Sequence, residues 1–279
     1  DFAPFDQPQI SPIGFDALVK NEKGIKKFCS YFYNQTSFLI DRKIIRDSDK
    51  FDLNPFSNND LNLLGLNSSF RNSLFFNRGK QKHSTTYTYV TSRTRNLLSI
   101  GLLESENKSH QLQYLHLLDK SWLLNFSSKS IFSAVFSENY VARNFVIKGY
   151  QLMPKIAYLF SKNTSLDLFY EYQKKENHIG NNELLTQNRF GSSFTYSGKK
   201  QFTANGEFSF YSIAYNGNSY SSVGFQMLEG LQPGKNQTWR LLIQKNLTKN
   251  LDINLNYQGR KSETSQTIHT GSVQLRAYF

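Results

Sequence analysis

Histidine and serine are the residues of this 279-residue chain whose types could support hydrolytic chemistry. On a β-strand, a histidine base and a serine nucleophile share a face only when they lie an even number of positions apart. His269 and Ser272 are three positions apart, and the residue two positions after His83 is Thr85. The five histidines lack the spacing of metal ligands, and a single cysteine, Cys29, excludes a cysteine-rich metal site. We therefore expect no catalytic residue, no metal site, no cofactor and no enzymatic activity.

A second set of chemically capable residues consists of charged side chains inside otherwise alternating segments. Opposed charges across a water-filled lumen could filter solutes. They could also pair with one another and fill a narrow barrel, and this second outcome is our expectation. The predicted lumen-lining residues are Lys155, Arg189, Arg240, Arg276, Asp167, Glu171, Glu207 and Asp252.

Period-two alternation of apolar and polar residues predicts the elements that position these charges. Within residues 251–258, for example, Leu, Ile, Leu and Tyr alternate with Asp, Asn, Asn and Gln. Such a pattern indicates β-strands with one dry and one wet face. Turn residues divide the chain into twelve predicted strands, at 36–45, 62–77, 84–103, 109–118, 121–136, 145–160, 165–176, 183–197, 201–215, 237–247, 251–260 and 268–279.

The connections between these strands differ in length at the two ends of the predicted sheet. Short links fall at 119–120, 161–164, 198–200 and 248–250, and longer ones at 46–61, 104–108, 137–144, 177–182, 216–236 and 261–267. Transmembrane β-barrels have short periplasmic turns and longer external loops. The fold class we predict is therefore all-β, an up-and-down antiparallel transmembrane β-barrel of about twelve strands over residues 36–279. Residues 1–35 would form an irregular periplasmic extension or plug, and both chain ends would be periplasmic.

Composition agrees with strands, and not helices, crossing a membrane. Aromatic residues make up 15% of the chain although its mean hydropathy is only −0.53, and no apolar stretch approaches the ~20 residues of a membrane-spanning helix. The alternative is a soluble β-sandwich whose apolar faces pack together. Long strands, aromatic residues near strand ends and an Asn- and Ser-rich polar face favour the membrane.

One long connection, residues 216–236, is too apolar in its centre for a freely solvated loop. It contains Val223, Phe225, Met227 and Leu228. It could fold into the lumen as a constriction or pack on a partner chain. An extra hairpin strand at 219–229 is the alternative that remains open.

The net charge of +12 comes from residues after position 60. Most of these basic residues fall in turns and loops, where simple solvation or contact with lipopolysaccharide phosphates is expected. Lys175 and Arg260 belong to the end with the longer loops. Because no basic stripe alternates with aromatic residues in a recognisable module, we expect no nucleic-acid partner.

The last residues carry a resemblance to known proteins. Phe279 is preceded by Leu275 and Val273 in an alternating segment, Ile268 to Phe279. This segment resembles the terminal-strand signal of bacterial outer-membrane β-barrels. More narrowly, the last 20 or so residues look like the C-terminal barrel region of large, mostly uncharacterised Bacteroidota outer-membrane β proteins, in which the similar region is often the C-terminal part of a longer polypeptide. The resemblance implies recognition by the outer-membrane barrel assembly machinery.

These observations predict an integral outer-membrane β-barrel that acts as a structural subunit of a larger envelope assembly. Its partners would be outer-membrane lipid and lipopolysaccharide, the assembly machinery during biogenesis, and other envelope proteins in a complex. The alternative function is a passive, porin-like diffusion channel for small solutes. A soluble β-rich surface adhesin is the third hypothesis.

Overall fold

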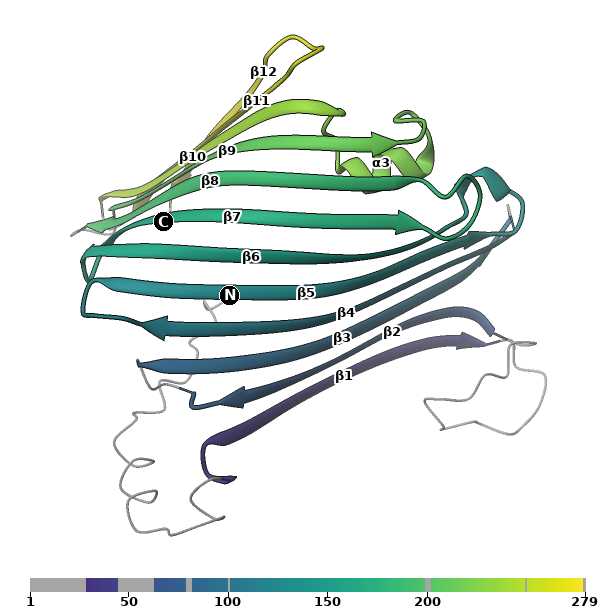
Figure 1. Ribbon diagram of the computed structural model, residues 1–279, viewed down its shortest axis with the longest axis horizontal. Helices are drawn as coiled ribbons and strands as arrows, with labels where there is room; N and C mark the ends of the chain where they lie inside the picture. The colour runs from purple at the N-terminus through teal and green to yellow at the C-terminus, as the bar shows by residue number, and fades with distance from the viewer. Residues whose placement is uncertain are drawn as a thin grey trace.

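Twelve antiparallel strands form one sheet in which every strand pairs with its neighbours in the chain (Figure 1). The computed structural model describes residues 29–44, 63–78, 82–99, 101–198, 202–248 and 250–277. The strands are β1 (Phe32–Ile44), β2 (Leu63–Phe76), β3 (His83–Leu98), β4 (Gly101–Leu117), β5 (Trp122–Ser137), β6 (Phe145–Ser161), β7 (Thr164–Asn177), β8 (Leu184–Gly198), β9 (Phe202–Asn216), β10 (Gly234–Thr248), β11 (Leu251–Ser262) and β12 (Ile268–Ala277). The predicted strand number and up-and-down order are confirmed.

The strand boundaries correct two details of the sequence-based prediction. Residues 104–108, predicted as a loop, lie inside β4, and the link between β3 and β4 is at 99–100. Residues 104–108 are all polar and therefore have the composition of a turn, although they continue a strand. In addition, β1 begins at Phe32, before the predicted start at 36; residues 1–28 lie outside the described part.

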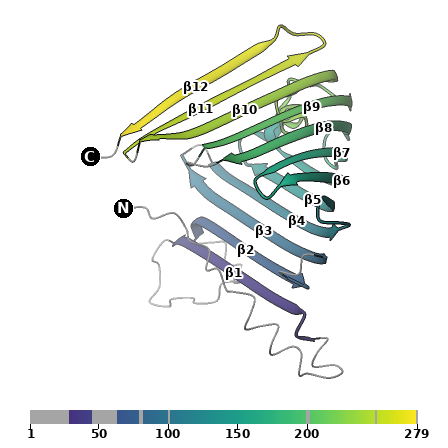
Figure 2. The same ribbon diagram turned by 90° about the vertical axis from the view of Figure 1, so that its left-hand side faces the viewer.

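The sheet is curved, with a hollow side and a bulging side. Figure 2 shows β1 and β12 at its two ends, both bent toward the same side of the middle strands. Residues directly opposite each other in an antiparallel pair point to the same face, so the register assigns every side chain to the concave or the convex face. A short helix, α3 (Ser222–Leu228), lies on the concave side, behind β8 and β9 in Figure 1. Among the described residues, no helix is long and apolar enough to cross a membrane.

The convex face carries large apolar side chains that no described residue covers. A row of them crosses neighbouring strands in the middle of the sheet. Its exposed members include Phe126, Leu152, Leu168, Tyr170, Phe190, Phe194, Phe208 and Phe210. An exposed apolar surface of this kind needs an apolar neighbour, because burying such side chains away from water is favourable.

Close packing on the convex face also explains one glycine. Trp239 on β10 lies directly opposite Gly259 on β11. A Cβ atom at Gly259 would come within 2.3 Å of the indole ring, so only glycine lets the ring lie flat over the strand. The indole Nε1 then donates to the Tyr257 hydroxyl at 3.3 Å. Aromatic coverage of a strand glycine is a recognised way to fix strand register.

Candidate functional site

The concave face brings the predicted lumen residues together. Strand register links them across neighbouring strands, because Glu171 faces Arg189, Glu207 faces Arg240, and Asp252 faces Arg276. Lys155 and Asp167 lie on the same face of β6 and β7. All eight residues therefore point to the concave side, spread over strands β6 to β12.

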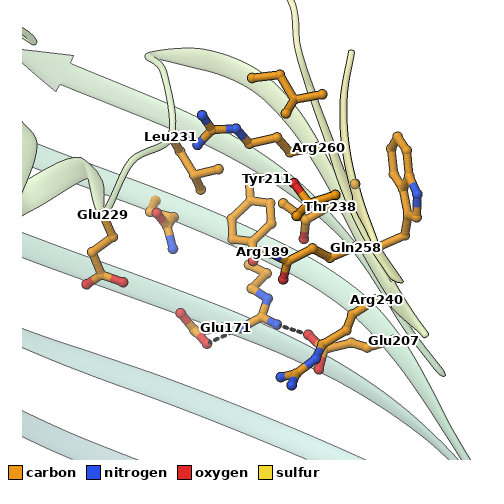
Figure 3. A pocket seen from close by; sticks show the side chains of 15 residues that line it. Glu171, Arg189, Glu207, Tyr211, Glu229, Leu231, Thr238, Arg240, Gln258 and Arg260 are labelled. Atoms are coloured by element: carbon orange, nitrogen blue, oxygen red, sulfur yellow. Dashed lines mark hydrogen bonds and ion pairs between the residues drawn. The ribbon is translucent and has the colours of Figure 1, made fainter. Parts of the chain in front are cut away.

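Arg189 is the centre of the most connected group of these residues (Figure 3). Its guanidinium forms an ion pair with Glu171 at 3.3 Å and a shorter one with Glu207. Two of its nitrogens also donate to the Ser209 hydroxyl, at 3.1 and 3.2 Å. Its Cζ lies 4.7 Å from the ring centroid of Phe169, close enough for a cation–π contact. Arg189 on β8 is thus held by neighbours on the two adjacent strands, β7 and β9.

A second ion pair lies further along the same face. Lys155 on β6 contacts the Asp167 carboxylate on β7, which also accepts a hydrogen bond from Ser193 at 3.3 Å. In contrast, Arg240 makes no ion pair or hydrogen bond with a described residue, although Glu207 lies opposite it. At least five of the eight predicted residues are therefore joined in ion pairs, and the concave wall is close to neutral along β6 to β9.

The apolar part of the loop 216–236 folds into helix α3. Ser221 caps its start, because the Ser221 hydroxyl accepts a hydrogen bond from the Gly224 amide at 2.9 Å. Glu229 ends it in a left-handed conformation, with φ of 53°. The extra hairpin strand considered for 219–229 is therefore wrong. A capping serine and apolar residues at helical spacing, 223, 227 and 228, were the sequence signals of a helix.

Helix α3 packs against the concave face and not against solvent. Val223, Met227 and Leu228 are buried, with Met227 only 1% exposed, whereas Phe225 is 71% exposed. The wall beneath them is formed by Phe145 and Ile147 of β6, Leu185 of β8 and Ile213 of β9. Of the four loop residues singled out in the sequence, three therefore anchor the helix and one remains free.

Two basic residues fasten the segment around α3, and their role was missed in the sequence. Lys175 donates a hydrogen bond to the Met227 carbonyl oxygen at 3.2 Å and forms an ion pair with Glu229. Arg260 donates to the Gly230 carbonyl oxygen at 2.9 Å. Both had been expected among solvated loop residues. Nothing local in the sequence distinguishes them, because their partners are far away along the chain.

A cleft of about 510 Å³ lies between the α3 segment and strands β7 to β12. Figure 3 shows Arg189, Tyr211 and Glu207 on its floor, with Glu229 and Leu231 of the α3 segment along one side. Arg240, Gln258, Arg260 and Thr238 complete the wall on β10 and β11. The cleft is polar, because negatively charged carboxylates and positively charged guanidinium groups both line it. It suits a hydrated solute path better than an apolar ligand.

The residues of the proposed assembly signal are, where the structure describes them, highly exposed. Val273 and Leu275 lie on the convex face of β12 and are 64% and 62% exposed. Phe279, the proposed end of the assembly signal, lies outside the described residues. Nowhere in the described part do three or more His, Cys, Asp or Glu side chains gather in a way that could hold a metal ion.

The chain matches no protein-family model and no curated protein. Solved structures do resemble it. The siderophore receptor PirA from Acinetobacter baumannii aligns over 88% of this chain and 41% of its own, with 9% identity and a TM-score of 0.53. The ferric-catecholate import receptor Fiu from E. coli K12 aligns over 87% and 52%, with 9% identity and a TM-score of 0.52. The NanC porin aligns with 12% identity and a TM-score of only 0.40, over 76% of this chain and 94% of its own.

These likenesses define the class of fold. At 9% identity the two receptors show a shared architecture and nothing about ligands. The chain has the antiparallel, up-and-down strand arrangement of the outer-membrane β-barrels. It spans about half or less of the length of either receptor.

Proposed function

We propose that this chain forms part of the wall of an outer-membrane β-barrel through which small polar solutes pass. The observation that carries the proposal is α3, which packs on an apolar patch of the concave face and so narrows the space that the face encloses. Phe225 is left exposed on this helix, where a passing solute would meet it. The ion-paired wall beneath gives the path a polar, nearly neutral lining.

The convex face supports a position in a membrane. Its exposed aromatic and aliphatic side chains suit contact with hydrocarbon, which is where an outward-facing barrel surface lies. Toward the end with the longer loops, the same face becomes charged, with Arg93 paired to Glu104 and Lys108 paired to Glu106 on β3 and β4. Such groups suit the headgroup region, where phosphates of lipopolysaccharide would be partners. The short turns would then be periplasmic, and so would the start of β1 and the end of β12, which lie at the same end of the sheet.

A structural subunit of a larger envelope assembly is the second candidate. Its support is the neutralisation of the concave wall by Lys155–Asp167 and Glu171–Arg189–Glu207, which leaves few charges free to select solutes. In that case the assembly machinery and other envelope proteins would be its partners. A soluble adhesin receives no support, because the apolar convex face would then be exposed to water.

Ion conductance separates the two candidates. We would purify the protein in its native assembly from outer membranes and record single channels in a planar bilayer. Replacing buried Met227 with Asp should release α3 and raise the conductance at least about twofold, because a charge cannot stay in that apolar contact. The matched control is Gln226→Asp, which adds the same charge at the neighbouring exposed position of the helix.

The outcomes are distinct. Open-channel current that rises in Met227→Asp and not in Gln226→Asp supports passage narrowed by α3. Current that is the same in all three proteins overturns the role of α3. Complete absence of current from the native assembly overturns passage and favours the structural subunit.

A further inference from the structure

The two edge strands of the sheet have a neighbour on one side each. β1 pairs with β2, and β12 pairs with β11. Among the described residues, no pairing joins β1 to β12, and the order of the sheet runs from one to the other without closing. Figure 2 shows the two strands at opposite ends of the curved sheet. Side chains along the whole of β12 are correspondingly exposed.

An unpaired edge is unstable in the setting that the proposed function requires. In a strand, alternate backbone N–H and C=O groups point to either side, and no described strand pairs with the outward-pointing groups of β12 or β1. Water satisfies such groups at the surface of a soluble protein. Hydrocarbon cannot, and membrane-spanning sheets therefore close. This step rests on the proposed position in a membrane.

Strand direction limits how the edges can be satisfied. Because the sheet has twelve strands in up-and-down order, β1 and β12 run in opposite directions. They can be bridged either by direct pairing or by an even number of further antiparallel strands. Direct pairing would require the sheet to curl more tightly, whereas its concave side already holds α3 and a cleft of about 510 Å³. The structure therefore favours added strands.

We propose that β1 and β12 are docking edges for an even number of additional antiparallel β-strands, supplied by the same polypeptide outside residues 29–277. The strands would alternate apolar and polar side chains, to continue the convex and concave faces. Bacterial outer-membrane barrels characteristically close within one chain. The shared architecture with the two receptors agrees, since the twelve strands align with only 41% and 52% of those single chains.

Photocrosslinking identifies the neighbour of each edge. In the full-length polypeptide, in bacterial outer membranes, Ser272 of β12 would be replaced by p-benzoylphenylalanine, and Ser37 of β1 in a separate variant. Both side chains lie on the concave face by register. Ser193 of β8 is the matched control, because its neighbours Asp167 and Glu207 on β7 and β9 are known. Mass spectrometry then maps the peptides joined to each site.

The expected products at Ser272 and Ser37 have the mass of one chain and contain peptides from outside residues 29–277. Peptides joining β12 to β1 at the mass of one chain would mean a closed twelve-stranded barrel and overturn the proposal. The same peptides at the mass of two chains would mean pairing of two copies, and peptides of another protein would mean a heterologous partner; either result overturns it. Absence of products at both edges, with products at Ser193, overturns it as well. None of these results depends on conductance, so failure here is distinguishable from failure of the proposed function.

Discussion

Arg189 shows how single residues of the concave face are held. Its partner Glu171 has a side chain only 7% exposed, so the carboxylate has little water to stabilise its charge. The guanidinium supplies that stabilisation and also contacts Glu207 and the face of Phe169. Removing one member of a buried charged group usually costs more than the group contributed, because the other member is left unpaired.

The first prediction concerns this group. Arg189→Met should lower the free energy of unfolding by about 2 kcal/mol, since it leaves Glu171 without its cation. Arg240→Met, on the same face, removes an arginine without an ion pair among the described residues and should change stability by less than about 0.5 kcal/mol. Urea titration of the refolded proteins in detergent micelles, followed by heat-resistant mobility on gels, measures both. Equal losses of unfolding free energy in the two variants would contradict the role of Arg189 as the cation that stabilises Glu171.

At the scale of elements, α3 is held by both packing and polar contacts. Seven residues are too few for a stable isolated helix, so the helix depends on the wall below it. Met227 and Leu228 supply the apolar contact, and Lys175 ties the C-terminal end of the helix to β7. A cation near the C-terminal carbonyl groups of a helix is favourable.

The second prediction tests this tie. In Lys175→Met, amide hydrogen exchange within residues 222–229 should become about tenfold faster. A hydrogen bond to a charged group contributes roughly 1.5–3 kcal/mol, and the exposure of Glu229 puts the expected effect at the lower end of that range. Lys174→Met is the control, because its side chain points to the convex face of the same strand. Exchange that is unchanged in Lys175→Met, or equally faster in both, would show that Lys175 does not secure α3.

At the scale of the whole molecule, the sheet is a wall with two chemically different faces. Apolar side chains such as Phe190 cover the convex face, and polar ones such as Gln258 the concave face. The same strands therefore carry both faces, and this explains a negative mean hydropathy in a chain rich in aromatic residues. If the convex face contacts lipid, a new charge should destabilise the protein on the convex face and be tolerated on the concave face.

The third prediction follows from this difference. Phe190→Arg should reduce the stability of the folded protein in lipid vesicles by about 2–4 kcal/mol, the cost of an arginine on the lipid face near the bilayer midplane. Gln258→Arg places the same side chain on the hydrated face and should be tolerated. Folding yield in vesicles against urea concentration measures both. Similar tolerance of the two substitutions would contradict the lipid-facing assignment.

Local pattern in the sequence determined the strands and their faces. Alternation has the period of a strand and is readable from neighbouring residues, so the twelve strands and the shared face of residues such as Glu171 and Arg189 followed from it. It failed at residues 104–108, where polar residues continue a strand, and at α3, whose helix depends on a distant wall. The tertiary structure alone decided that Lys175 and Arg260 fasten α3, and that the sheet stays open between β1 and β12 in the described residues. Both depend on contacts between residues far apart in the chain, which no local pattern records.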